Sequence, residues 1–406
     1  MNVIVFEDKY INDLNPISIN HASFEIKCGI LTNLERIVNN FDSNEIKFIL
    51  IVRDNLKELV QEKFPRFTVN PNVIPNGLFV NGAALWNKEK LKKIQEGHAF
   101  SNLGRLLSFK SNKQIDQENF HEYLQDISKV TSDLDVEIIT YQWELIDKIE
   151  KYINLDINEL SKSSEFVKHY TGTQNLNQSI IKIGSNENIF LHENSMVEPG
   201  TILDSRNGPI ILNHGALVES GSIIKGPVFV DNNSIINNAT KLKSNVIIGP
   251  NCKVGGEISN SIFNGFSNKQ HDGFLGHSII GEWVNLGANT NTSNLKNNYS
   301  KIKFNFSDKI VETNKQFLGV IIGDYSRSAI GTLFNTGTYV GLGANIFSNN
   351  FSKKYIKSFS WGDSEVVDFS KFIQTIKLMK QRRNKKITEV EIKFLQKLYE
   401  NSSKIS

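Results

Sequence analysis

One histidine, His271, lies in a segment of polar and small residues that spans positions 267–276 and reads SNKQHDGFLG. A neutral imidazole held in a cleft can take a proton from an amine or a hydroxyl while that group attacks an acyl carbon. Around this segment stand one acid and three residues that offer amide groups: Glu257, Asn285, Ala288 and Asn294. Backbone amides and Asn side chains can bind a developing oxyanion or a sugar hydroxyl. The combination predicts acyl transfer with His271 as general base, although a single loop histidine is by itself more often structural.

The region around this segment has a sequence repeat of six residues. Every sixth residue from Leu212 to Val254 is aliphatic: Leu212, Val218, Ile224, Val230, Ile236, Leu242, Ile248 and Val254. A second column, four residues after each member, runs from Ala216 to Ile258 and is mostly small or β-branched. Such a pattern is typical of a left-handed parallel β-helix, in which each turn of three short strands buries its aliphatic residues against the next turn.

The corners of the predicted β-helix fall three residues after each member of the aliphatic column. Five of the seven corner positions from Gly215 to Asn251 hold Gly or Asn, which tolerate a left-handed backbone. The same register returns at 191–203, 280–286 and 322–346, and it is interrupted at about 259–278 and about 294–316. Insertions into repeats form loops on one face, which is often the working face.

The two ends of the chain follow other patterns. Strands are expected at Val3–Phe6, Phe48–Val52, Leu78–Val80 and Ile138–Tyr141, and helices at Phe24–Val38, Leu56–Phe64, Phe369–Leu378 and Glu389–Tyr399. The alternation in the first part predicts an α/β layer with a largely parallel sheet. We therefore expect an α/β domain at 1–170, a β-helix at 180–350 and a helical arm at 351–406. The arm contains a basic run, Lys380–Lys386, which in most proteins is only a solvated surface.

Composition narrows the class of protein. A net charge of +3 over 406 residues is too small to indicate nucleic-acid binding. The two cysteines, Cys28 and Cys252, fall in a helical pattern and in the small-residue column, so we expect buried free thiols, as in a reducing cytoplasm. The apolar run in MNVIVFEDKY is too short for a signal peptide, and no segment approaches the roughly 20 apolar residues that span a membrane. A cytoplasmic protein without a membrane or nucleic-acid partner is expected.

Several segments together resemble a known family. SNKQHDGFLG at 267–276, IGEWVNLGANT at 280–290, NLKNN at 294–298, FNTGT at 334–338, SFSWGD at 358–363 and ISINHASFEIKCGILT at 17–32 carry the resemblance. They are similar to the bacterial sugar nucleotidyltransferase family related to the bifunctional glucosamine-1-phosphate acetyltransferase/N-acetylglucosamine-1-phosphate uridylyltransferase. The resemblance covers nearly the whole chain, and the β-helix motifs are more specific than the amino-terminal ones.

In the β-helix, the resemblance implies an acetyltransferase that uses acetyl-CoA as a substrate. His271 corresponds to the general base, and Glu257 to the acid that orients it. Asn285 and Asn294 correspond to residues that contact the amino sugar and its phosphate, and Ala288 supplies a backbone amide that faces the acetyl group. This chain also differs from the family, because Ser259 stands where a sugar-binding Lys is usual and tyrosines are replaced by Phe274 and Leu295.

In the amino-terminal domain, the resemblance implies a nucleotidyltransferase, which uses Mg²⁺ and would place Glu7, Asp8, His21, Lys27 and Asn81 at its site. Enzymes of this type hold the triphosphate in a Gly-rich loop after the first strand. Here the first strand runs directly into two acids, and Gly29 is the first glycine. Acids at this place repel phosphate unless Mg²⁺ intervenes. His21 and Lys27 stand where relatives usually have Arg, and Asn81 where they have a metal-binding Asp.

Two hypotheses of different class follow. The first is an enzyme of nucleotide-sugar synthesis for the cell envelope, which joins a sugar-1-phosphate nucleotidyltransferase to an acetyl-CoA-dependent amino-sugar-1-phosphate N-acetyltransferase. The second is a sugar-nucleotide-binding or scaffold protein with a degenerate nucleotidyltransferase domain. In either case the β-helix is expected to form a homotrimer. We also expect Arg382 and Arg383 of the basic run to meet the phosphates of coenzyme A.

Overall fold

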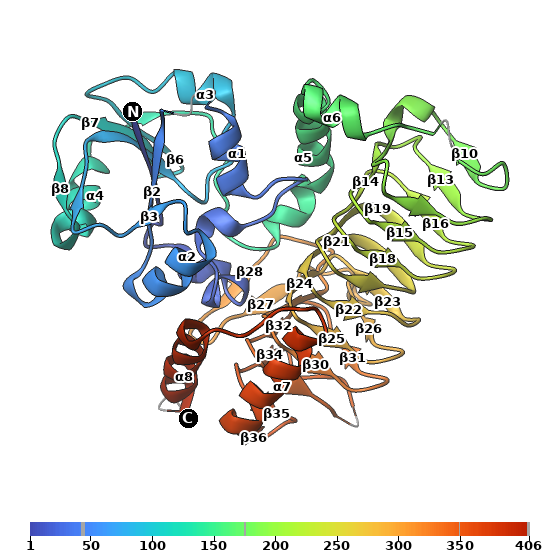
Figure 1. The fold of residues 1–406 in the computed structure, drawn as a ribbon. Helices are drawn as coiled ribbons and strands as arrows, with labels where there is room; N and C mark the ends of the chain where they lie inside the picture. The colour runs from blue at the N-terminus through green and yellow to red at the C-terminus, as the bar shows by residue number, and fades with distance from the viewer. Residues whose placement is uncertain (42–44, 174–175, 349, 404–406) are drawn as a thin grey trace.

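The computed structural model describes residues 1–406 except 42–44, 174–175, 349 and 404–406. An amino-terminal α/β domain lies beside a long β-helix, and two carboxy-terminal helices pack at the far end of the β-helix (Figure 1). Among the described residues no helix is both long enough and apolar enough to cross a membrane. Cys28 and Cys252 are buried free thiols, as predicted.

The amino-terminal domain is built on one seven-stranded sheet. Its strands in order are β3 (Thr68–Val69), β2 (Lys47–Ile51), β1 (Asn2–Phe6), β5 (Gly77–Asn81), β7 (Arg105–Ser111), β6 (Ala99–Asn102) and β9 (Ser132–Asp133). The first four are parallel to one another, and β7 is antiparallel to both of its neighbours. β1 is a continuous apolar run, and Val3 to Phe6 are fully buried, as expected for a central strand covered on both faces. The predicted α/β layer is confirmed.

The helices of this domain lie on both sides of the sheet and along its border with the β-helix. They are α1 (Asn33–Asn39), α2 (Lys57–Lys63), α3 (Lys88–Lys92), α4 (Phe120–Ile127), α5 (Glu144–Leu160) and α6 (Ser164–His169). A short antiparallel pair, β4 (Val73–Ile74) with β8 (Ile115–Asp116), packs Ile74 and Ile115 into the apolar cluster that contains Ile4 and Phe6 of β1.

Two predicted elements of this domain were wrong. The helix predicted from Phe24 begins only at Asn33, because a capping box at Thr32 starts it: the Thr32 hydroxyl accepts the Glu35 N–H at 3.2 Å and the Glu35 carboxylate accepts the Thr32 N–H at 2.7 Å. Gly29, with φ +86°, lies in the irregular stretch before it. The strand predicted at Ile138–Tyr141 makes only one isolated bridge, from Ile138 to Ala84.

The β-helix has three faces of stacked parallel strands. The face that contacts the amino-terminal domain, called here the docking face, holds β11 (Ile189–Leu191), β14 (Ile210–Leu212), β17 (Val228–Val230), the second halves of β19 (Lys241–Ile248) and β21 (Glu257–Gly265), β24 (Ile279–Glu282), β29 (Val320–Ile322), β32 (Thr338–Val340) and β34 (Tyr355–Ile356).

The middle face follows the docking face along each turn. It holds β12 (Met196–Val197), β15 (Leu217–Val218), β18 (Ile235–Ile236), β20 (Lys253–Val254), β22 (Asn268–Lys269), β25 (Asn285–Leu286), β30 (Arg327–Ser328), β33 (Asn345–Ile346) and β35 (Ser360–Trp361), and β36 (Glu365–Val366) pairs antiparallel with β35. The third face holds β10 (Ile181–Ile183), β13 (Ile202–Asp204), β16 (Ile223–Lys225), the first halves of β19 and β21, β23 (Phe274–Gly276), β26 (Asn291–Thr292) and β31 (Leu333–Phe334).

The aliphatic column forms the interior of this β-helix. Leu212 pairs with Val230 and Val230 with Ile248, and all three side chains are fully buried. Left-handed backbone occurs at the predicted corners, with φ +55° at Asn233 and +57° at Asn251. Hexapeptide spacing therefore produces the stacked register that the sequence predicts.

The first predicted interruption, at about 259–278, was wrong, because the β-helix continues through it. Strand pairing links Ile248 to Phe263, and Val254 to Lys269, so these turns are shorter than the preceding ones. The corners at Gly255-Gly256 and at Asn260 have fewer residues than those of the turn before, and the sixfold spacing is lost while the stacking remains.

The second interruption is a true insertion. The chain leaves the β-helix after β26 and forms an antiparallel hairpin, β27 (Lys303–Asn305) with β28 (Ile310–Glu312). Phe304 of this hairpin packs between Trp143 at the start of α5 and Tyr339 of the docking face, with ring centroids 5.1 and 5.9 Å away. The hairpin therefore joins the two domains.

The carboxy-terminal arm consists of α7 (Phe369–Gln381) and α8 (Glu389–Ser403), close to the predicted bounds. Phe372 and Ile376 of α7 and Leu395 of α8 are buried in the same apolar cluster as residues of the amino-terminal sheet. The first residue of the basic run, Lys380, is buried and pairs with Glu391. The arm thus contacts both the β-helix and the α/β domain.

The stacked interior predicts that substitutions at two adjacent residues of β19 change the free energy of unfolding by very different amounts. Leu242 is fully buried, whereas Lys241 points outward and is exposed. Leu242→Ala should lower the free energy of unfolding by about 2–5 kcal/mol because it leaves a cavity between two turns. Lys241→Ala should change it by less than about 0.5 kcal/mol. Urea denaturation followed by circular dichroism measures both, and equal effects of the two variants would contradict the assigned register.

Candidate functional site

The predicted nucleotidyltransferase residues Glu7 and Asp8 lie at the carboxyl end of β1, where an open parallel sheet usually binds its ligand. The Glu7 carboxylate accepts hydrogen bonds from the Ser23 N–H at 2.9 Å, the Arg53 N–H at 3.0 Å and Arg53 Nη1 at 2.9 Å. Burial raises the pKa of Glu7, although Arg53 acts in the opposite direction. Glu7 therefore holds the turns after β1 and β2 together.

Asp8 is engaged in the same way by Arg105 of β7. Arg105 Nε and Nη2 donate to Asp8 Oδ2 at 3.0 and 2.8 Å, and Asn81 Nδ2 donates to the same oxygen at 2.9 Å. The Asn81 side-chain oxygen accepts the Ala83 N–H. Every carboxylate oxygen of Glu7 and Asp8 already accepts a hydrogen bond from described residues. Arg53 and Arg105 also place a positive charge against each carboxylate, so as arranged here these residues do not fit a Mg²⁺ ion, which a guanidinium at this distance would repel.

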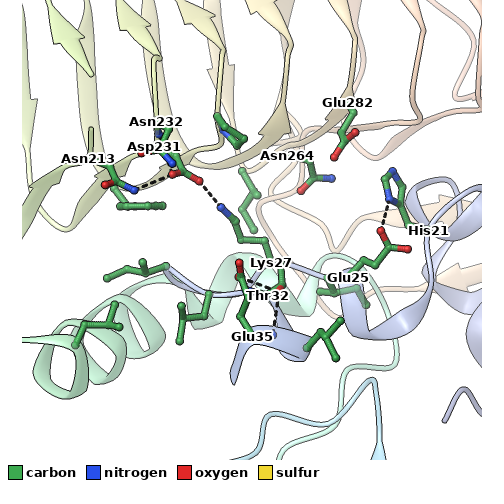
Figure 2. Close-up of a pocket in the computed structure, with 18 of the residues that line it drawn as sticks. His21, Glu25, Lys27, Thr32, Glu35, Asn213, Asp231, Asn232, Asn264 and Glu282 are labelled. Atoms are coloured by element: carbon green, nitrogen blue, oxygen red, sulfur yellow. Dashed lines mark hydrogen bonds and ion pairs between the residues drawn. The ribbon is translucent and has the colours of Figure 1, made fainter. Parts of the chain in front are cut away.

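The other two predicted nucleotidyltransferase residues, His21 and Lys27, lie in a different place. They line a cavity of about 750 Å³ between the amino-terminal domain and the docking face. Figure 2 shows Lys27, Glu25 and Glu35 on the amino-terminal side of this cavity, with Asp231, Asn264 and Glu282 opposite on the β-helix. Its apolar lining includes Phe229, Ile262 and Ile279.

Lys27 forms an ion pair across this boundary. Its ammonium lies 2.7 Å from the Asp231 carboxylate, and Asn213 Nδ2 donates to the other oxygen of Asp231 at 3.0 Å (Figure 2). Burial acts to lower the pKa of Lys27, but the Asp231 charge outweighs it and the pKa is raised. The pKa of Asp231 is lowered correspondingly, against the effect of burial.

His21 forms the second link between the domains. Its Nε2 lies 2.8 Å from Asp324 of the β-helix, and its Nδ1 lies 3.3 Å from Glu25. Burial alone would lower the pKa of His21, but the Asp324 charge and the hydrogen bonds that the imidazolium donates to both carboxylates outweigh it and raise the pKa to about 10. Lys63 pairs with Glu25 beside this link.

These ion pairs determine which charged groups of the cavity are available to a ligand. The cationic groups of Lys27, His21 and Lys63 each face a carboxylate already, so a triphosphate would have to displace an ion pair to reach them. The side chains of Asn264 and Glu282 make no hydrogen bond to any described residue and face the cavity (Figure 2).

Two groups of described residues have the composition of a metal site. One is His169, His192 and Glu193, and the other is His21, Glu282 and Asp324. In the first group the His192 Nδ1 accepts the Asn194 N–H at 3.1 Å, and His169 lies between Glu193 and Glu165. In the second group the raised pKa of His21 favours the imidazolium, which cannot bind a cation. Hydrogen bonds and ion pairs already engage the histidines of both groups.

The predicted acetyltransferase residues lie mostly together, at the corner between the middle and third faces. His271 is exposed in the loop between β22 and β23. The Glu257 N–H donates to the carbonyl of Gly273 at 3.2 Å, so the start of β21 lies beside this loop. The Glu257 carboxylate pairs with Lys243 at 2.7 Å rather than with the imidazole.

Asn285 and Ala288 lie on the next turn. Asn285 Oδ1 accepts a 3.5 Å hydrogen bond from Asn268, three residues before His271. The turn that follows Ala288 packs directly on the His271 loop, since a Cβ placed on Gly273 would come within 2.2 Å of the Thr290 carbonyl oxygen. The Ala288 N–H has no acceptor among the described residues.

Asn294 lies apart from these residues, at the other end of β23. Its Nδ2 donates to His277 Nδ1 at 2.9 Å, and the His277 ring stacks on Phe317. Burial lowers the pKa of His277, which keeps its imidazole neutral and able to accept a proton. His277 was missed in the sequence, where only its position six residues after His271 could have drawn attention to it.

The basic run reaches the His271 corner through one of its arginines. Arg383 Nη2 donates to Asn268 Oδ1 at 3.0 Å, whereas the side chain of the exposed Arg382 makes no hydrogen bond or ion pair with any described residue. The arm therefore places one guanidinium on the middle face, beside the strand that leads into the His271 loop.

Comparison with known proteins identifies a matching family for the amino-terminal domain and several relatives of the chain. Residues 3–165 match a family model described as sugar nucleotidyl transferase. The "Bifunctional protein GlmU" of Methanococcus aeolicus is 33% identical over 132 residues, which cover 31% of this chain and 31% of that protein. The "Bifunctional sugar-1-phosphate nucleotidylyltransferase/acetyltransferase" of Sulfurisphaera tokodaii is 27% identical over 142 residues, 34% of this chain and 35% of that protein.

A third relative, the "Bifunctional protein GlmU" of Wigglesworthia glossinidia brevipalpis, is 31% identical over 176 residues, 40% of this chain and 35% of that protein. The chain thus spans about a third of the length of these curated relatives. A crystal structure of a hexapeptide transferase family protein from Anaplasma phagocytophilum is 12% identical and covers 56% of this chain and 97% of that one, with a TM-score of 0.15. The predicted resemblance to the sugar nucleotidyltransferase family is confirmed.

The His21 link predicts a pH-dependent contribution to stability. Because the pKa of His21 rises from 6.5 to about 10 on folding, its stabilisation is fully present below pH about 6.5 and is lost as pH rises through about 10. His21→Gln should therefore be most destabilising, relative to the native protein, near pH 6, and least so near pH 10. Urea denaturation across this range measures the difference, with exposed His98→Gln as control. A difference that does not vary with pH would contradict the assignment.

Proposed function

We propose that this protein is a two-part enzyme of nucleotide-sugar synthesis in the cytoplasm, with products used for the cell envelope. The β-helix at 180–350 transfers the acetyl group of acetyl-CoA to the amine of an amino-sugar 1-phosphate. The domain at 1–170 couples a nucleoside triphosphate to a sugar 1-phosphate and releases pyrophosphate. The family match at 3–165 and the names of the bifunctional relatives support this assignment.

The observation that carries the acetyltransferase proposal is the arrangement at the His271 corner. An exposed imidazole, an amide side chain on Asn285 and an Ala288 N–H that no described residue accepts lie on adjacent turns of one β-helix. Acyl transfer needs these three functions: a proton acceptor, a group that positions the acceptor substrate and a donor for the oxyanion.

The proposed reaction follows from these positions. The sugar amine attacks the thioester carbon, His271 takes the amine proton, and the Ala288 N–H stabilises the oxyanion as the new C–N bond forms. The C–S bond then breaks, and the proton held by His271 passes to the departing sulfur, so that coenzyme A leaves as a thiol. Glu257 orients His271, which requires its carboxylate to exchange Lys243 for the imidazole when substrate binds.

Substrate and coenzyme are proposed to bind on either side of this corner. Asn285 contacts the amino sugar. Arg383, which already lies on the middle face through Asn268, and Arg382 beside it meet the phosphates of coenzyme A by charge-assisted hydrogen bonds.

We further propose a homotrimer that completes this site. The amino-terminal domain covers the docking face only, and Ile181 and Leu333 on the third face remain 52% and 38% exposed. The separation of Asn294 from the His271 loop supports a shared site, since the Asn294 of a second copy could supply the missing contact. Three copies related by a threefold axis would cover the third and middle faces.

A second candidate function concerns the amino-terminal domain alone. Its predicted catalytic groups pair with other residues of the protein: Asp8 with Arg105, His21 with Asp324 and Lys27 with Asp231. This observation favours a domain that orients the β-helix or binds a sugar nucleotide without transferring a nucleotidyl group. Pyrophosphate release from UTP or dTTP with sugar 1-phosphates distinguishes the two, because only an active nucleotidyltransferase releases it.

His271→Ala tests the acetyltransferase proposal. The variant should fold normally and lose roughly 10²–10⁴-fold in the rate of acetyl transfer, because the exposed imidazole contributes to proton transfer and not to the interior. Thiol release from acetyl-CoA with glucosamine 1-phosphate measures the rate, and His121→Ala, an exposed histidine of α4, serves as control. Thiol release at the native rate in His271→Ala would refute the role of His271.

The proposed assembly has its own test. Light scattering at micromolar concentration should give about three times the 45.9 kDa mass of one chain. A stable monomer under these conditions would count against both the trimer and a site that two subunits share.

A further inference from the structure

Lys269 occupies a position in the β-helix where the sequence repeat places an aliphatic side chain. It pairs in register with Val254, a member of the aliphatic column, and its side chain points into the interior. Lys269 is only 1% exposed, and it is among the largest fully buried side chains of the described structure. A lysine in this column is therefore a departure from the pattern that stabilises the fold.

The ammonium of Lys269 is held by main-chain carbonyls. Its Nζ donates to the Gly255 oxygen at 3.1 Å and to the His271 oxygen at 2.8 Å. Two glycines with left-handed backbone leave the space for it, since a Cβ on Gly256 would lie 3.0 Å from Nζ and a Cβ on Gly273 3.4 Å. The ammonium therefore links the corner after β20 to the loop that contains His271.

Burying this amine is costly, because desolvation disfavours its charged form and no carboxylate among the described residues forms an ion pair with it. Burial accordingly lowers the pKa of Lys269 to about 8, although Asp272 acts in the opposite direction. An aliphatic residue would avoid this cost and would pack on Val254 as elsewhere in the column. The presence of a lysine at this position is thus explained by the hydrogen bonds that its ammonium donates to the Gly255 and His271 carbonyls.

We propose that Lys269 is a positioning residue that fixes the main chain at His271, and thereby the direction in which the imidazole faces the acyl acceptor. The inference rests on the proposed role of His271, but the link itself can be measured without activity. Gly255, which accepts the second hydrogen bond, lies two residues before Glu257, so the same ammonium also sets the corner from which the orienting acid projects.

The test compares Lys269→Met, Lys269→Gln and, as a matched control, Lys253→Met on the neighbouring strand, where the side chain points outward. Met removes both hydrogen bonds, whereas the Gln amide can still donate to the carbonyls. Lys269→Met should accelerate amide hydrogen exchange across 270–274 and lower kcat for acetyl transfer roughly 10–100-fold, with little change in the KM for acetyl-CoA. Lys269→Gln should retain more of both properties, and Lys253→Met should match the native protein.

Each outcome is informative. Faster exchange with an unchanged kcat would overturn the positioning role, as would native exchange and native kcat in Lys269→Met. If Lys269→Met does not fold, Lys269→Gln decides. Native exchange and native kcat in Lys269→Gln support the link, whereas a lowered kcat with native exchange across 270–274 overturns it. If the native protein transfers no acetyl group, the proposed function fails, and the exchange data then test the link alone.

Discussion

The structure depends on the burial of each β-helix turn against the next. No single turn has an interior of its own, so residues such as Val230 and Ile248 become buried only when a further turn covers them. Stacking fixes the position of each corner relative to the one before it, as long as the register holds. The His271 loop belongs to one turn and Asn285 and Ala288 to the next, and this stacking brings them to one corner. A defect in register upstream would therefore move all of them.

A second constraint acts between the domains. The docking face is apolar at its centre, where Ile211, Ile247 and Ile321 pack with α5, and charged at its border. The buried ion pairs Lys27–Asp231 and His21–Asp324 lie at that border. Buried pairs contribute little net stability because desolvation offsets their attraction, but breaking one leaves an uncompensated charge. They therefore specify one relative placement of the domains more strongly than they stabilise it.

Much of the fold could be predicted from the sequence because its interactions are local or periodic. Hexapeptide spacing is visible by counting, and the column from Leu212 to Val254 became the interior. The turn through Lys269 could not be predicted, because shortened corners at Gly255-Gly256 and Asn260 removed the spacing on which counting depends. The start of α1 was also missed, since Thr32 and Glu35 form a capping box only when the chain turns there.

Individual residues of the candidate site could be predicted from the sequence, but their partners could not. His271 could be singled out because its segment interrupts the repeat and resembles a family motif. The partners of Lys27 and His21 lie more than two hundred residues away along the chain, and no local pattern indicates a charge pair over such a separation. The amino-terminal charges could therefore be recognised as candidate site residues, but their engagement with the β-helix could not be foreseen.

The β27–β28 hairpin has a consequence for the order in which the chain can assemble. Trp143 lies in the domain that is synthesised before the β-helix, yet its ring packs against Phe304 of the hairpin. At about 5–20 residues per second, synthesis reaches the hairpin roughly 10–30 s after Trp143. During this interval the apolar side of α5 has no complete cover. A newly made amino-terminal domain therefore exposes this apolar surface until the β-helix has been synthesised. A chaperone bound to that surface would have to dissociate as the last turns of the β-helix fold.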